Sequence, residues 1–128
     1  MTPTTSLATS VCQIAVPCKD VSRATAFYRD ALGLQFVFES GGLAFLMCGS
    51  VRFMLAKPEA NDPVHAISCV YFSTDDIIEA AKTLASKGAA MEGEPHIVGR
   101  LPGRDVWLAH WRDTEGNLMA FMQERPTA

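Results

Sequence analysis

Two side chains in apolar segments of the chain could carry out chemistry on a ligand. His110 lies between Trp107 and Trp111, and an imidazole, with an unperturbed pKa of about 6.5, suits proton transfer as a general base. A half-buried histidine that hydrogen-bonds Tyr71 or a water is the alternative interpretation. Cys69 is a candidate nucleophile, although cysteine is also common as a small buried hydrophobe.

Arginines are the candidates for binding an acidic group. Arg52 lies in a short apolar segment, where a buried guanidinium needs a carboxylate or a ligand as its partner, whereas at a rim position water would hydrate it. Arg100 and Arg104 lie in the stretch 96–105, which predicts an irregular loop long enough to act as a lid. There they could receive a carboxylate, a sulfate or a phosphate, or they could pair with acids such as Asp105.

Composition narrows the possible partners. Lys and Arg total 11 while Asp and Glu total 14, a net charge of −3, and no run of basic residues could follow a phosphate backbone. Residues 1–10 lack the cationic start and the apolar stretch of a signal peptide. Every apolar run ends well before the roughly 18 residues that a transmembrane helix needs. We therefore expect neither a nucleic-acid nor a membrane partner.

The cysteines indicate a reducing compartment. Cys12, Cys18, Cys48 and Cys69 show no CxxC spacing, so the sequence indicates neither a disulfide framework nor a zinc knuckle. The cytoplasm is the expected location.

The length of 128 residues supports one ordinary core, because folding can bury about two thirds of the surface of such a chain. Hydrophobic residues make up 48% and charged residues 20%, which excludes intrinsic disorder and exceeds what most soluble monomers need. We assign the apolar excess to a cavity and a subunit contact.

A pattern of strands and helices must position the candidate residues, and it occurs twice. In the first half, alternation and helical spacing predict a strand over 11–17, a helix from Asp20 to Gly33, and strands over 34–39, 43–47 and 51–56. The second half repeats the order with a strand over 67–73, a helix from Asp76 to Gly88, and strands over 90–92, 106–111 and 117–123. Helical spacing also predicts the core residues Phe27, Tyr28, Ile77, Ile78 and Leu84.

We therefore predict a single α+β domain over 11–124, built from two tandem βαβββ modules. The modules span 11–56 and 66–124, with a linker over 57–65 and a flexible N-terminal segment over 1–10. His65, beside the linker's prolines, is expected at the surface.

Three motifs point to a family. They are Gln13-Ile14-Ala15-Val16, the segment Ala26-Phe27-Tyr28 that leads to Leu32-Gly33-Leu34, and Arg112-Asp113-Thr114-Glu115-Gly116-Asn117. Together with the duplicated order, they resemble the vicinal oxygen chelate superfamily, which includes glyoxalase I, bleomycin-resistance proteins and extradiol dioxygenases. The resemblance covers residues 11–124. It implies two modules that form a curved mixed sheet, a cup whose concave face holds the active site, and helices on the convex face.

The resemblance also implies positions for a metal. Such proteins use a His, Gln or Glu from the first strand and a carboxylate or His from the fourth strand of each module, positions that fall here on Gln13, Met54, Cys69 and Ala120. Ala120 has no donor and Met54 offers only a soft thioether, which hard divalent cations disfavour. We therefore expect no metal or other cofactor; the alternative is Zn, Ni, Fe or Mn held by Gln13, His110 and Cys69.

The alternation of side chains along the predicted strands indicates which residues would line the cup. Besides Gln13 and Met54, they are Phe45, Met47, Arg52, Tyr71, Leu108, His110 and Met122. Such a lining suits a flat or apolar small molecule that Arg52, Tyr71 or His110 orients, although the methionines could merely fill space.

Several functions remain open. One is a metal-independent binding protein of the bleomycin-resistance type, which binds a small apolar or aromatic ligand with or without an acidic group. Another is a metal-dependent lyase, isomerase or oxidoreductase of the glyoxalase or dioxygenase kind. A third, an epimerase or thiol transferase for an anionic substrate, would depend on Arg52. The resemblance further implies a homodimer, in which four modules surround two cups.

Overall fold

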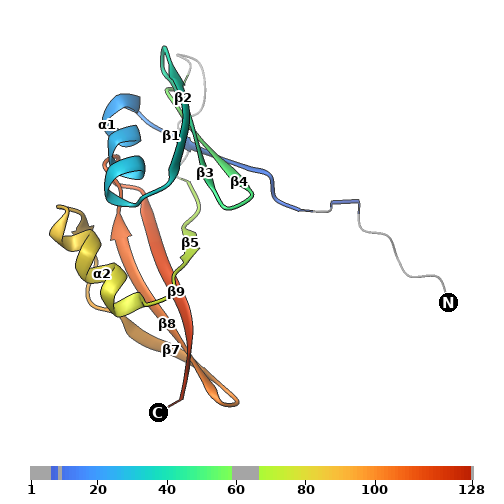
Figure 1. The fold of residues 1–128 in the computed structure, drawn as a ribbon, viewed down its shortest axis with the longest axis vertical. Helices are drawn as coiled ribbons and strands as arrows, with labels where there is room; N and C mark the ends of the chain where they lie inside the picture. Colours follow the sequence, from blue (N-terminus) through green and yellow to red (C-terminus); the bar gives the residue numbers. More distant parts are fainter. Residues whose placement is uncertain (1–6, 9, 59–66, 128) are drawn as a thin grey trace.

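The computed structural model describes residues 7, 8, 10–58 and 67–127, which form two modules of the same topology (Figure 1). The first module contains β1 (Gln13–Pro17), α1 (Val21–Ala26), the π-helical turn η1 (Phe27–Ala31), β2 (Gln35–Ser40), β3 (Leu43–Cys48) and β4 (Val51–Ala56). The second contains β5 (Val70–Ser73), α2 (Ile77–Ser86), β6 (Ala90–Met91), β7 (His96–Leu101), β8 (Arg104–Arg112) and β9 (Leu118–Pro126). The linker, including His65, lies largely outside the described residues, as does most of the N-terminal segment.

The two sheets have matching strand orders. The first sheet has the order β1-β4-β3-β2, and the second has β5-β9-β8-β6 with β7 also paired to β8. In each sheet the strand before the helix pairs parallel with the last strand, and the remaining pairs are antiparallel. This confirms the predicted α+β fold of two βαβββ modules in curved mixed sheets.

The prediction of an irregular loop over 96–105 is wrong, because this stretch forms most of the β7–β8 hairpin. The glycines and the proline that suggest a loop have other roles in it. Gly99 lies at a register shift in β7, and Gly103 follows Pro102 in the hairpin turn with a φ of +76°, a conformation that glycine adopts readily. β6 and β7 both pair with β8, so they occupy together the edge position that β2 holds in the first module.

Both helices begin at the predicted capping residues. Their ends differ from the prediction, because α1 ends at Ala26 and continues as the π-helical turn η1 to Ala31, and α2 ends at Ser86. The Asp20 carboxylate accepts a hydrogen bond from the Arg23 amide, and the Asp76 carboxylate accepts one from the Glu79 amide. These caps satisfy amides that have no partner within the helix. No helix of the described residues is long and apolar enough to cross a membrane.

The two modules share one hydrophobic core. Both helices lie on the same side of the sheets (Figure 1), and aromatic rings join the modules beneath them. The Phe53 ring on β4 lies 5.5 Å from the Phe72 ring on β5, and the Phe27 ring on η1 lies 5.8 Å from the Trp111 ring on β8. The molecule therefore has a single core that neither module could form by itself.

Four of the five predicted core residues pack as expected. Tyr28, Ile77 and Leu84 are buried, and Phe27 packs against the core from its edge. Ile78 is a wrong prediction, because 38% of its surface is exposed. Successive residues of a helix are separated by about 100° around its axis, and the rotation from the fully buried Ile77 places Ile78 toward the outer side of α2.

A buried hydrogen bond ties the modules together at the turn between β8 and β9. The Tyr28 hydroxyl donates to the Asp113 carboxylate over 2.7 Å. The other donors to this carboxylate are the amides of Glu115 and Asn117 and the Asn117 side chain. Burial, together with the neighbouring Asp113 charge, raises the pKa of Tyr28 far above its ordinary value.

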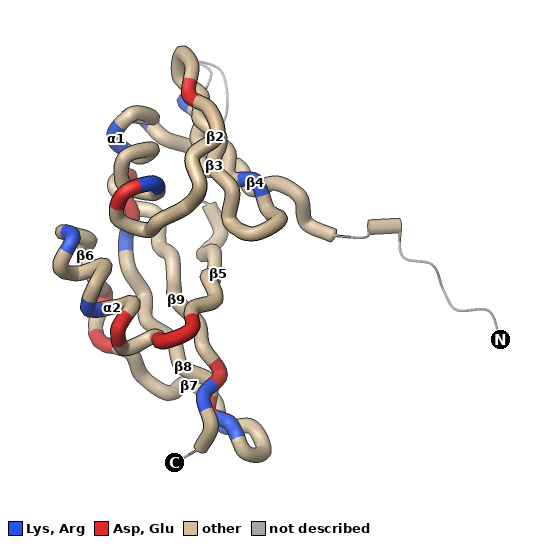
Figure 2. Tube along the Cα trace, viewed as in Figure 1, with Lys and Arg blue, Asp and Glu red and all other residues tan. Residues whose placement is uncertain are grey.

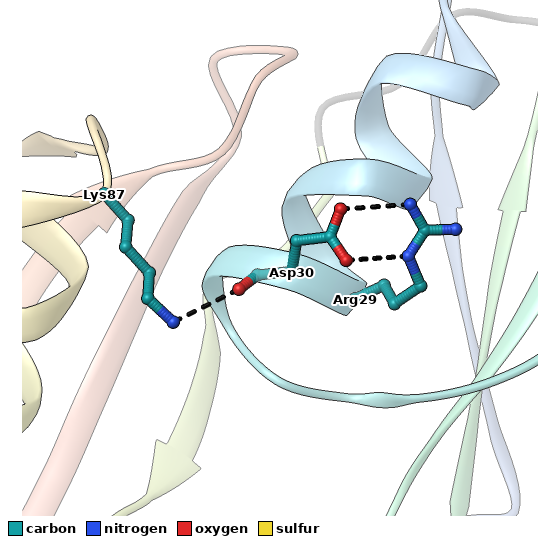
Figure 3. A network of polar contacts seen from close by, with 3 residues as sticks. All are labelled: Arg29, Asp30 and Lys87. Carbon is teal, nitrogen blue, oxygen red and sulfur yellow. Dashed lines mark hydrogen bonds and ion pairs between the residues drawn. The ribbon is translucent and has the colours of Figure 1, made fainter.

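Surface contacts add to this connection. The Glu115 carboxylate accepts hydrogen bonds from the backbone amides of Lys19 and Asp20, just before α1. Figure 3 shows a second contact, in which the Lys87 ammonium at the end of α2 donates to the Asp30 carbonyl oxygen over 3.2 Å. The Asp30 carboxylate meanwhile pairs with Arg29. Exposed pairs of this kind contribute little to stability.

The Tyr28–Asp113 bond yields the first prediction. Replacing Tyr28 with Phe leaves the buried carboxylate without one donor, so we expect the free energy of unfolding to fall by about 1–3 kcal/mol. Urea denaturation measures the loss. Tyr71→Phe is the matched control, since Tyr71 is 53% exposed. If the two variants unfold at the same urea concentration, the hydrogen bond between Tyr28 and Asp113 does not stabilise the fold.

The buried Cys18 thiol yields a prediction about pH. Cys18 is 1% exposed, and burial, followed by the charges of Glu115 and Asp113, raises its pKa from 9.0 to about 12. Above pH 9 the unfolded chain therefore loses this proton while the folded chain keeps it, so stability falls as pH rises.

We expect the free energy of unfolding to decrease by on the order of 3 kcal/mol from this thiol between pH 9 and pH 12. Chemical denaturation across this range measures the slope. Cys18→Ala should make it shallower, while Cys12→Ala, at an exposed thiol, should leave it unchanged. A slope that Cys18→Ala does not alter would refute this assignment.

Candidate functional site

With the exception of Arg100, the predicted site residues lie on or beside the sheet face that points away from the helices, which we call the open face. Alternation fixes this face, because Val16, Leu46, Phe53, Phe72 and Trp111 are buried on the helix side. The open face of the first sheet carries Gln13, Phe45, Met47, Arg52 and Met54, and that of the second carries Tyr71, Leu108, His110, Ala120 and Met122.

A polar chain crosses β1 and β4 on the first sheet. Gln13 lies opposite Arg52 in the parallel pair of strands, and the Arg52 Nε donates to the Gln13 Oε1 over 2.7 Å. The Gln13 Nε2 in turn donates to the Met54 sulfur over 3.7 Å. Both ends of the Gln13 amide are thus engaged, and the amide fixes the direction of the guanidinium.

Aromatic rings continue this cluster toward the edge of the sheet. The Arg52 guanidinium carbon lies 4.8 Å from the centre of the Phe45 ring, a cation–π contact. The Phe45 ring stacks with the Phe38 ring on β2 at 6.3 Å and an interplanar angle of 28°. Met47 lies opposite Arg52 on β3. The first sheet therefore presents a cation at the end of an aromatic surface.

Phe38 is a member of this cluster that sequence reasoning missed. Strict alternation places Phe36 and Phe38 on the same face, but the register shifts between them. Phe36 lies opposite Leu46, on the helix side, and Phe38 lies opposite Phe45, on the open face. Three consecutive large apolar residues, Phe36 to Phe38, are the one sequence signal that could have indicated such a bulge.

A second cluster lies on the other sheet. The Tyr71 and His110 rings meet edge to face with centres 6.3 Å apart. Ala120 lies between them in the strand register and is fully buried, since its small side chain lets the two rings close over it. Leu108 and Met122 face each other one step further along the same strands.

Cys69 directly precedes β5 beside this second cluster. Partial burial raises the pKa of its thiol, although a hydrogen bond with Tyr71 and the positive charge of Arg112 act in the opposite direction. The neutral thiol is consequently the dominant form near pH 7, which weighs against a role as a nucleophile.

The two clusters are separate within one chain. Hydrogen bonds and ring contacts between open-face side chains of the described residues link members of the same sheet. The inter-module contacts lie on the helix side, in the shared core. Among the residues that the structure describes, no hydrogen bond or ring contact joins the two clusters, so each sheet carries one half of the predicted site.

Arg100 and Arg104 do not lie on a lid. Arg100 lies opposite Asp105 on the face away from the open face and pairs with its carboxylate at 3.6 Å. Arg104 pairs with Glu124 at 3.5 Å. Arg100 thus lies on a strand of the hairpin with Asp105 as its partner, and not on a lid over the open face. Lys and Arg positions are distributed over both modules (Figure 2).

The family's metal positions carry a donor set that does not suit a divalent cation. Ala120 supplies no donor, the Met54 sulfur already accepts from Gln13, and the Gln13 oxygen faces a guanidinium. A cation at this oxygen would meet the positive charge of Arg52 at close range. Across the described ranges, no three His, Cys, Asp or Glu side chains gather into a group that could hold an ion.

A groove of about 450 Å³ lies elsewhere, on the helix side between the end of η1 and the start of α2. Leu34, Cys48, Phe72 and Asp76 contribute to its walls. The predicted site residues do not line it, so it is distinct from the open face.

Comparisons with known proteins agree on the fold. Lactoylglutathione lyase from Agrobacterium tumefaciens is 26% identical, with a TM-score of 0.70 over 91% of this chain and 95% of that one. The integron cassette protein VCH_CASS1 from V. cholerae is 21% identical, with a TM-score of 0.75 over 93% and 98%. TnmS3, an antibiotic binding protein from Streptomyces sp. CB03234, is 19% identical, with a TM-score of 0.73 over 96% and 100%.

A search of curated proteins finds no match. The family model for the Glyoxalase/Bleomycin resistance protein/Dioxygenase superfamily, by contrast, matches residues 10–121. With the duplicated βαβββ topology and this match over most of its length, the chain belongs to the glyoxalase/bleomycin resistance protein/dioxygenase superfamily.

Proposed function

We propose that this protein binds a small apolar or aromatic molecule on its open face, without a divalent metal at the family's metal positions. The observation that carries the proposal is the replacement of metal donors by the Gln13–Arg52–Met54 chain beside exposed aromatic rings. Phe38 is 47% exposed and Tyr71 53%, so both rings offer surface to a ligand.

The comparisons supply a parallel for such a function. TnmS3, which has the same fold, is described as an antibiotic binding protein. Fold similarity alone does not transfer its ligand to this chain. It does indicate that a chain of this architecture can bind an antibiotic.

A second copy of the chain would complete the site. The two open-face clusters are separate in one chain, and β2 exposes three consecutive hydrophobic residues at a sheet edge, Phe36, Val37 and Phe38. Soluble proteins normally cover such an edge. Residues 10–12, just before β1, also lead away from the body of the molecule (Figure 1), and Val11 is 64% exposed. We therefore propose a homodimer located in the cytoplasm, where the four free thiols would stay reduced.

A metal-dependent lyase is the second candidate, favoured by the likeness to lactoylglutathione lyase. It would need Gln13, His110 and Cys69 around one ion. Gln13 is engaged with Arg52 on the first sheet, whereas His110 contacts Tyr71 on the second. This distribution makes the lyase the weaker proposal.

Metal removal separates the two candidates. Protein treated with a chelator should bind 2-naphthamide, a neutral planar probe, in a saturable way when followed by calorimetry. Adding Zn²⁺, Ni²⁺, Fe²⁺ or Mn²⁺ should change the affinity by less than about twofold, because the donor set holds no ion. Phe45→Ala should weaken binding, and Ile78→Ala, on the outer face of α2, serves as its control.

An affinity gain of about tenfold or more with one of these metals would instead favour the metal-dependent enzyme. If the dimeric wild-type protein does not bind the probe, the binding proposal is wrong.

The homodimer is tested by sedimentation equilibrium at micromolar concentration. We expect twice the chain mass of 13.9 kDa. A second copy would cover the exposed apolar edge strand β2 and would complete the site that one chain divides between its two sheets. If the site is shared between copies, dilution that dissociates the dimer should also reduce probe binding. A monomeric mass would contradict the proposal.

A further inference from the structure

We propose that Arg52 makes the open face a site for the carboxylate of a planar aromatic acid, at the position where the family resemblance implies a divalent cation. The inference rests on the proposed binding function and names the chemical class of its ligand. A guanidinium and a metal ion both attract anionic oxygen, but the guanidinium binds a carboxylate through directed N–H donors.

The positive charge of Arg52 is available to a ligand. Four other arginines of the described chain pair with carboxylates, namely Arg29, Arg100, Arg104 and Arg112. Arg52 instead uses its Nε to donate to the neutral Gln13 amide. In the described part of the chain it forms no ion pair, so its terminal Nη groups can donate to a carboxylate while its charge stays uncompensated.

Two neighbours hold this guanidinium in place. The Gln13 oxygen accepts from Nε on one side, and the Phe45 ring lies 4.8 Å from the guanidinium carbon on the other. Gln13 is itself held by its bond to the Met54 sulfur. Because the side chain is fixed before a ligand arrives, less conformational entropy is lost on binding. Gln13 is accordingly a positioning residue for Arg52.

The aromatic part of the ligand follows from the rings next to Arg52. Phe45 and Phe38 form a stacked pair that leads from the guanidinium to the exposed edge strand. A planar ring that lies against this pair would have its acidic group within reach of Arg52. The site therefore distinguishes an aromatic carboxylate from a neutral ring of the same shape.

A matched pair of probes tests the inference. 2-Naphthoate and 2-naphthamide have the same ring system and differ in charge, and calorimetry at pH 7 and low salt measures both. Wild-type protein should prefer the acid by about tenfold or more, because only the acid forms charge-assisted hydrogen bonds. The preference should shrink as salt is added, since the guanidinium is solvent-accessible.

Three variants test whether Arg52 causes the preference for the acid. Arg52→Met should abolish it, and Arg52→Lys should retain only part of it, because an ammonium lacks the planar fork. Gln13→Glu should also abolish it, since the new carboxylate would pair with Arg52 and compensate its charge. Arg23→Met is the matched control on the exposed face of α1 and should bind as the wild type does.

Each outcome has a definite meaning. Equal affinity of the wild-type protein for both probes would overturn the anion site while leaving the proposed binding function in place. Failure of the wild-type protein to bind either probe would overturn both. Should Arg52→Met or Gln13→Glu keep the preference for the acid while retaining the wild-type circular dichroism spectrum, Arg52 is not the anchor, and the inference is wrong.

Discussion

The buried hydrogen bond between Tyr28 and Asp113 connects the two halves of this fold. Tyr28 projects from the end of the first helix, and Asp113 begins the turn between the last two strands, so one contact of 2.7 Å sets the first module against the second. The same carboxylate organises its own turn by accepting from Glu115 and Asn117. A buried carboxylate is tolerated only when its oxygens have donors. The bond with Tyr28 adds a donor from the other module, and it therefore holds the helix end against this turn, next to the aromatic core that both modules share.

This shared core determines where function can be located. Because the modules pack through their helix-side faces, each sheet has its other face free, and alternation assigns every strand residue to one face or the other. The side chains that fill the core can change little without loss of packing. The open face is free of this constraint. In this chain it carries a guanidinium, a histidine, aromatic rings and thioethers, which suit recognition of a small molecule by shape and charge.

Much of this arrangement could be predicted from the sequence, since alternation, capping residues and glycine stops are local signals. They indicate the two modules, both helix starts and the side of the sheet on which Arg52 and His110 lie. The failures have local causes too. The π-helical turn after Ala26 shortens the first α-helix, Ile78 lies about 100° around the helix axis from the buried Ile77, and the bulges at Val37 and in β7 reverse the facing of later residues. The bond between Arg52 and Gln13 depends on strand register, which a single sequence specifies only weakly.

That bond is also the basis of the proposed binding site, in which Arg52 stands where metal donors are lacking. With Met54 and Ala120 at two of the implied positions, the donors left on the open face are too few and too soft for a hard cation. A ligand anion would nevertheless still find positive charge there, because Arg52 lies opposite Gln13 in the strand register and bonds to it. A guanidinium supplies charge and direction but no vacant coordination position, so it can hold an anionic oxygen without polarising it as a Lewis acid does. The proposed function, binding of a ligand rather than its conversion, depends on this property of the guanidinium.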